Sequence, residues 1–167
     1  MTSVLRVPAT VLILLVAVLL GACGSDVPTE GGDAEASDPA AIEAITGALQ
    51  TMFSWNPATD TSSADAYVRA IPYLTDELAA QAGQRTERGP GRQWQDWAAS
   101  GAAVDAEAYV VVAEHTKDTP DRIERTVMVV QTVRAPDQSV LESIETEAEV
   151  SATRTPQGWR VSAISIR

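Results

Sequence analysis

The amino-acid sequence predicts an α+β domain in which helices come first and a curved antiparallel sheet of four strands follows. Before Gly101 the apolar residues recur at helical spacing, and after Gly101 they alternate with polar residues as in half-buried strands. The joints between the alternating segments, "KDTPD", "APDQS" and "TPQG", contain the Pro or Gly typical of turns. We therefore expect the helices to pack on one face of the sheet.

The first helix is predicted to follow Ser37 or Asp38, with Pro39 at its first position, and to end near Asn56-Pro57. One face of this helix is apolar and carries Ile42, Ile45, Leu49, Met52 and Phe53. A second helix is expected from Ser63, with Tyr67, Val68 and Ile71 before Pro72. A third follows Thr75 as far as about residue 82, and a short fourth covers "QWQDWAAS" before Gly101.

The four strands are predicted at residues 104–115, 122–134, 140–153 and 159–166. The segment from residue 38 to residue 167 is then long enough to form one domain with its own apolar core.

The first 22 residues have the three parts of a secretory signal. Arg6 is the only charged side chain there, residues 11–20 are apolar, and the small pair Gly21-Ala22 precedes the only cysteine, Cys23. An apolar run of this length is shorter than the roughly 20 residues that a membrane-spanning helix needs. Residues 24–37 are rich in Gly and acids, which predicts a flexible linker.

The motif Leu20-Gly21-Ala22-Cys23 resembles the lipobox of bacterial lipoproteins. The resemblance implies cleavage before Cys23, a diacylglyceryl group on its sulfur and an acylated (for instance palmitoylated) amino terminus. The mature protein would then be held by lipid on the extracytoplasmic face of the plasma membrane, because several acyl chains give stable attachment. An ordinary signal peptide with an incidental cysteine and an uncleaved anchor are the alternatives.

The charge balance of the chain limits the classes of partner that it can bind. Twelve Lys and Arg residues against 23 Asp and Glu residues give a net charge of −11, and loss of residues 1–22 removes only Arg6. Such an acidic chain is unsuited to nucleic acid, which requires basic faces. With Cys23 lipidated, no thiol is left for a disulfide. The sequence also has no motif for a metal or a cofactor.

The order of the expected elements resembles the nuclear-transport-factor-two-like, or cystatin-like, α+β cone fold. The resemblance covers residues 38–167 and is closest to the Mce-associated proteins, although these usually have a transmembrane helix; the periplasmic component of type IV secretion shares the general architecture. The residues that carry it are Phe53-Ser54-Trp55, Tyr67, Leu74-Thr75, Trp94 and Gly158-Trp159-Arg160-Val161. It implies a pocket between the first helix and the sheet, and a fold that hosts enzymes, binders and scaffolds alike.

Candidate site residues fall into a few groups. A pocket for a small apolar ligand would be lined by Met52, Phe53, Trp94 and Val129. A cluster of three arginines in a Gly/Pro-rich loop, Arg85, Arg88 and Arg92, could bind an anionic partner, or simply be solvated.

Several other polar groups are expected to be solvated rather than functional. His115, the only histidine, is expected at a strand edge, and Asp105 and Glu107 on a solvated or pocket-lining face. The carboxylates of Glu145, Glu147 and Glu149 are expected along one side of the third strand, about 7 Å apart, too far from one another to hold a cation alone.

The main functional hypothesis is a non-catalytic, lipid-anchored envelope protein that binds other envelope proteins as an accessory subunit of an export or lipid-uptake assembly. The second is a binder of a small apolar ligand, and the third an isomerase- or hydratase-like enzyme, which would require a buried Asp, Glu or His facing a cavity.

Overall fold

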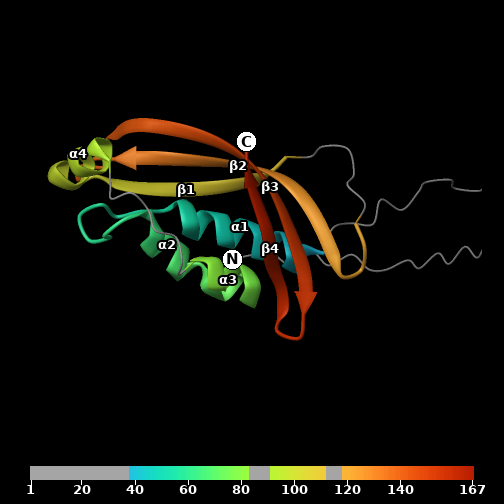
Figure 1. Ribbon diagram of the computed structural model, residues 1–167. Coiled ribbons are helices and arrows are strands. Elements are labelled where there is room, and N and C mark those ends of the chain that lie inside the picture. The colour runs from blue at the N-terminus through green and yellow to red at the C-terminus, as the bar shows by residue number, and fades with distance from the viewer. Residues whose placement is uncertain (1–37, 83–90, 112–117) are drawn as a thin grey trace, which may run out of the picture. The chain divides into compact units, whose positions relative to one another are not determined.

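The computed structural model describes residues 38–82, 91–111 and 118–167, and Figure 1 shows how their elements are arranged. Helices α1, α2 and α3 and the short η1 lie on one face of a four-stranded antiparallel sheet of order β1-β2-β3-β4, and α4 lies at one end of the sheet. The predicted α+β class and the helices-first order are confirmed.

Helix α1 (Pro39–Phe53) is the longest helix and lies along the sheet. Its N-cap is Asp38, whose side chain accepts a hydrogen bond from the main-chain N–H of Ala40 at 3.0 Å. The helix ends where Ser54 takes an extended conformation. Half of the residues on the buried face of α1 are alanines, and this face is formed by Ala41, Ala44, Ile45, Ala48, Leu49 and Met52. The alanines allow the helix to approach the sheet closely, while Ile42 and Phe53 are only half-buried.

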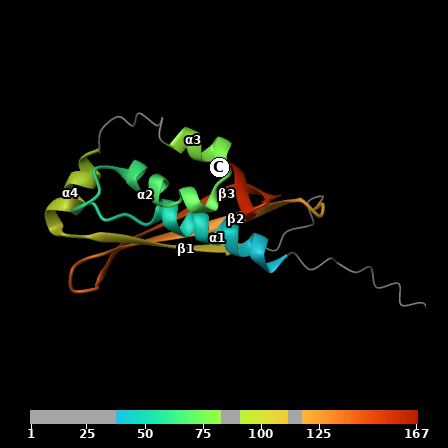
Figure 2. The same cartoon turned by 90° about the horizontal axis from the view of Figure 1, so that it is seen from below.

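The second helix is shorter than predicted. Helix α2 (Ser63–Arg69) has Ser62 as its N-cap, and Ile71 belongs instead to a separate 3₁₀ turn, η1 (Ile71–Tyr73). The reason is Pro72, which has no N–H to donate and disfavours the α conformation of the residue before it. Figure 2 shows α2 beside α1.

Helix α3 (Asp76–Ala82) begins after Thr75, as predicted. Helix α4 (Arg92–Ser100) ends at Gly101, whose φ of 69° closes the helix in the left-handed region that glycine tolerates. The prediction that Arg92 belongs to a loop is wrong. Gly91 is the extended N-cap, so Arg92 is the first helical residue.

The strands are β1 (Ala103–Val110), β2 (Arg122–Arg134), β3 (Val140–Thr155) and β4 (Gly158–Ile166). Strand β1 ends at Val110, and most of its predicted extension to residue 115 lies outside the described residues. Register shifts interrupt the ladders between Val133 and Arg134 and between Ser151 and Ala152. Such bulges increase local twist, and Figure 1 shows β3 and β4 bending across α1.

The inner face of the sheet and α1 form the core. Its main apolar cluster includes Ile45, Leu49, Val127, Val150 and Val161, all at most 1 % exposed. A smaller cluster of Ala102, Val104 and Val133 lies under Trp55 and Trp97. The only buried polar side chains among the described residues are Gln131 and Ser151.

Short segments cover part of both outer edges of the sheet. On β1, Val104 exchanges two main-chain hydrogen bonds with Trp55, at 2.8 and 2.9 Å. On β4, Leu74 forms a parallel bridge with Val161, whose carbonyl accepts from the N–H of Thr75 at 2.9 Å. Each of these contacts covers its edge strand, β1 or β4, at a single position.

Candidate interaction surfaces

The point where the domain joins the preceding chain is held by Asp38. One carboxylate oxygen, Oδ2, accepts hydrogen bonds from the indole Nε1 of Trp159 at 2.8 Å and from Arg154 Nη2 at 2.7 Å. The Arg154 guanidinium also lies over the Trp159 ring, 4.8 Å from its centroid. These donors, led by the Trp159 indole and the Ala40 N–H, lower the pKa of Asp38. The start of α1 is thereby tied to β3 and β4.

A second polar cluster ties the segment after α1 to α2 and β1. The Arg69 guanidinium donates to both carboxylate oxygens of Asp60, at 2.7 and 3.0 Å, and to the carbonyl of Ser54 at 2.9 Å. Ser54 Oγ in turn accepts from the N–H of Ala106 in β1. Partial burial favours the neutral acid, but the bonds from Arg69 outweigh it and the pKa of Asp60 is lowered. The charged groups of this cluster, Arg69 and Asp60, are paired with each other, so the cluster has a structural role.

The residues predicted for a ligand pocket do not all lie together. Met52 and Val129 are buried in the main apolar cluster, and Phe53 packs against it. Trp94 lies beside Trp55 instead, with ring centroids 5.7 Å apart. None of the four lines either of the two surface depressions described below, and a ligand cavity among them stays a prediction.

Of the three arginines predicted to bind a partner, only Arg92 is among the described residues. It is exposed at the start of α4, with its Nε 4.0 Å from the Asp96 carboxylate. Arg85 and Arg88 lie outside the described residues, as do His115 and Cys23. Within the described ranges no group of three or more His, Cys, Asp or Glu is placed to hold a metal ion.

A groove of about 540 Å³ runs between η1 and the β3–β4 turn. Its walls are Ile71, Pro72, Leu74, Thr75, Asp76 and Glu77 on one side and Thr153, Thr155, Pro156, Gln157 and Arg160 on the other. It mixes apolar, acidic and basic groups without a dominant chemistry.

The outer face of the sheet is another candidate surface, since α1, α2 and α3 lie on the opposite face and α4 lies at the end of the sheet. The register places Tyr109 beside Met128 and Met128 beside Glu147 in one cross-strand row, and Glu107, Val130 and Glu145 in the next. Tyr109 is 52 % exposed and donates its hydroxyl to Glu107, which raises the tyrosine pKa. Tyr109, Met128 and Val130 therefore form an apolar strip, and the glutamates of β3 form an acidic strip beside it.

The acidic strip is the predicted row of Glu145, Glu147 and Glu149, and the structure confirms that these side chains share one face of β3. Glu147 and Glu149 are both paired with Arg167 at the end of β4. Glu145 forms no ion pair with any other described side chain. The row is thus neutralised at one end only.

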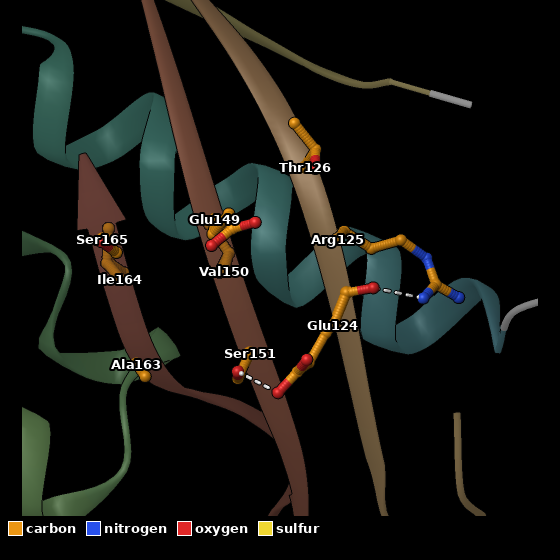
Figure 3. Close-up of a pocket in the computed structure, with 9 residues that line it drawn as sticks. All are labelled: Glu124, Arg125, Thr126, Glu149, Val150, Ser151, Ala163, Ile164 and Ser165. Atoms are coloured by element: carbon orange, nitrogen blue, oxygen red, sulfur yellow. Dashed lines mark hydrogen bonds between the residues drawn. The ribbon is translucent and has the colours of Figure 1, made fainter. Parts of the chain in front are cut away.

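A shallow hollow of about 210 Å³ lies at the neutralised end, over β2, β3 and β4 (Figure 3). Its lining is Glu124, Arg125, Thr126, Glu149, Val150, Ser151, Ala163, Ile164 and Ser165. Figure 3 shows the Glu124 carboxyl and the Ser151 side chain turned toward each other, 3.3 Å apart. Arg122 donates to both, which helps to lower the pKa of Glu124. The hollow's carboxylates already have cationic partners.

Sequence reasoning found the acidic row but missed the apolar strip and the Asp38 contacts. The signal for the apolar strip is the segment "TVMVVQTV". Two of its outward-facing residues, Met128 and Val130, are apolar, whereas a strand face in water usually carries polar residues. Nothing local in the sequence indicates that Trp159 lies against Asp38, because 121 residues separate them.

A likeness to a solved structure supports the fold. CagV, a VirB8 homologue of a T4SS from Helicobacter pylori strain 26695, superposes with a TM-score of 0.51 and 13 % identity. The alignment covers 77 % of this chain and 97 % of that one. The domain has a VirB8-like, nuclear-transport-factor-two-like fold.

The intermembrane-space region of the chloroplast protein ARC6 aligns over 77 % of this chain and 95 % of that one, with 13 % identity and a TM-score of 0.39. No family model and no curated protein matches the sequence. Within the described ranges of the chain, no helix is both long and apolar enough to span a bilayer.

Proposed function

We propose that this protein is a lipid-anchored, non-catalytic module of the cell envelope, and that its VirB8-like domain binds other envelope proteins as an accessory subunit of an export or lipid-uptake assembly. The observation that carries the proposal is the outer face of the sheet, over which no described element lies, with its apolar strip beside an acidic one. A surface of this composition is typical of protein interaction sites.

Three further features support the proposal. The sequence motif before Cys23 has the order of a lipobox. The linker that follows it leads into Asp38, where the contacts to Trp159 and Arg154 fix the start of the domain. The fold is shared with CagV, a VirB8 homologue of a T4SS. A tethered domain is concentrated near other membrane-bound proteins, which favours weak but specific contacts.

The anchor is tested by metabolic labelling with an alkyne fatty acid followed by membrane fractionation. The native chain should be labelled and recovered with membranes, and its amino-terminal peptide should begin at a lipid-modified Cys23. Cys23→Ala should lose both the label and the membrane association. A matched control, Ser25→Ala, should retain both. Equal membrane association of Cys23→Ala and the native chain, with no label in either, would refute the lipid anchor.

A further inference from the structure

Strand β3 is longer than its neighbour β4. The ladder between them covers β3 only from Ala148 to Thr155, and the last contact is the N–H of Arg167 donating to the carbonyl of Glu147 at 3.0 Å. The first seven residues of β3, 140–146, have β2 on one side, where all except Leu141 pair with it. No described strand lies on their other side, and Figure 1 shows this part of β3 at the border of the sheet. Seven residues match the usual length of a strand.

The direction of the free main-chain groups follows from the register. Along a strand, successive residues direct their N–H and C=O to opposite sides. Because the Glu147 carbonyl points toward β4, the N–H and C=O groups of Glu145 and Ser143 point the same way, beyond the end of β4. Two donors and two acceptors are therefore available for an added strand.

Two side chains at this edge are acidic and have no ion-pair partner among the described residues. Glu145 lies on the outer face, and Glu142 on the inner face accepts a hydrogen bond from the neutral amide of Gln93 at 3.1 Å. Between them, Ile144 is half-buried on the inner face. At the start of the strand, Val140 and Leu141 are 58 % and 54 % exposed.

We infer that the free edge of β3 binds an extended basic segment of another protein as an added strand. In an antiparallel arrangement, the residues opposite Glu145 and Glu142 would be basic and lie on opposite faces. The residue opposite Ile144 would be apolar. The recognised pattern, read from the amino end of the partner, is basic–apolar–any–basic. Main-chain bonds supply affinity in this mode and alternate side chains supply specificity.

A second copy of this chain does not fit the edge. The segment "VLESIETE" contains three glutamates and no cation. Antiparallel pairing of two copies would bring like charges together across the strands, which is destabilising. The same charges that exclude self-pairing select a basic partner.

The inference rests on the proposed role as an interaction module and is tested with a defined probe. The probe is a fluorescent, end-blocked octapeptide of Thr and Val with two lysines three positions apart. Its controls are the same peptide N-methylated on alternate residues and an acidic version with glutamate for lysine. Binding to the full-length protein in detergent is followed by fluorescence anisotropy, and hydrogen exchange reports protection of the amides of Ser143 and Glu145.

The lysine peptide should bind, protect both amides, and lose about tenfold or more in affinity on N-methylation. Glu145→Pro removes an N–H that faces away from β2, so it should abolish binding without breaking the β2–β3 ladder. Glu145→Gln should weaken binding severalfold, while Glu43→Gln, an equal charge change on exposed α1, should not.

Equal affinity of the N-methylated peptide would overturn the inference, because the attraction would then be charge alone. Protection of the edge by concentration-dependent dimers, seen in sedimentation without peptide, would overturn it in favour of a second copy. If Glu145→Pro does not fold, the N-methylated peptide still decides. Peptide binding does not depend on Cys23, so a failure here is distinguishable from a failure of the lipid anchor.

Discussion

The carboxylate of Asp38 accepts a hydrogen bond from the indole Nε1 of Trp159 at 2.8 Å, and thereby joins the residue that caps α1 to the last strand of the domain. The same side chain caps α1 through Ala40 and pairs with Arg154. One residue thus links the helix that forms the core to the hairpin that bends across it.

Replacement of Asp38 should destabilise the domain. Asp38→Ala removes the helix cap and leaves the Trp159 indole and the Arg154 guanidinium without their acceptor. We expect a lower midpoint of urea unfolding, measured by Trp fluorescence and circular dichroism. Glu43→Ala, on an exposed position of the same helix, should leave the midpoint unchanged; a similar loss in both variants would show that the cap contacts are unimportant.

The Asp38 contacts also predict a dependence on pH. The folded-state pKa of Asp38 lies below its ordinary value of 3.8, because the ionised form accepts the Trp159 and Ala40 hydrogen bonds. A group whose pKa is lowered by folding stabilises the protein above its unfolded pKa, and this contribution is lost as the pH falls through the folded pKa. The stability gap between the native chain and Asp38→Asn should therefore be constant near neutrality and narrow below pH 3.8. A gap that is equally wide below that pH would contradict the assignment.

Gly47 has a packing role in α1. A Cβ at this position would lie 2.7 Å from Cε1 of the Tyr73 ring. Alanine is favoured over glycine in a helix by about 1 kcal/mol, but Gly47→Ala must first displace that ring. We expect little or no gain from Gly47→Ala alone and a gain of about 1 kcal/mol when Tyr73→Ala is already present. Strict additivity in a double-mutant cycle of urea unfolding would argue against the contact.

Truncation of Leu49 to alanine should destabilise the domain more than the same truncation of Ile166. Leu49 is fully buried beneath the sheet, whereas Ile166 is 53 % exposed on β4. Leu49→Ala should cost about 2–5 kcal/mol of the free energy of unfolding because it leaves a cavity in the core. Ile166→Ala should cost much less. Similar losses in chemical denaturation would show that the helix does not pack on the sheet as described.

The fold was largely predictable because its signals are local. Pro39, Thr75, Gly101 and the change from helical to alternating periodicity each mark a boundary that the structure retains. The end of α2 differs from the prediction because Pro72 disfavours the α conformation of Ile71, although the apolar spacing of Ile71 fits a longer helix.

The candidate surfaces were less predictable because they depend on register and strand length. The row of glutamates on β3 could be read from the sequence, but the pairing of Glu147 and Glu149 with Arg167 depends on where β4 ends beside β3. The same end point leaves Ser143 and Glu145 with free main-chain groups. Neither sequence spacing nor charge indicates which part of a long strand lacks a neighbour.

The central claim, that the domain binds other envelope proteins through its uncovered sheet, is tested most directly by photo-crosslinking in intact cells. The photoreactive residue p-benzoylphenylalanine is placed at position 109 on the outer face and, as a control, at position 43 on α1, each with and without Cys23→Ala. The account predicts discrete protein adducts from position 109 that require Cys23, and none of the same mass from position 43. Adducts that are equal at both positions, or no adduct from position 109 in the anchored protein, would contradict it.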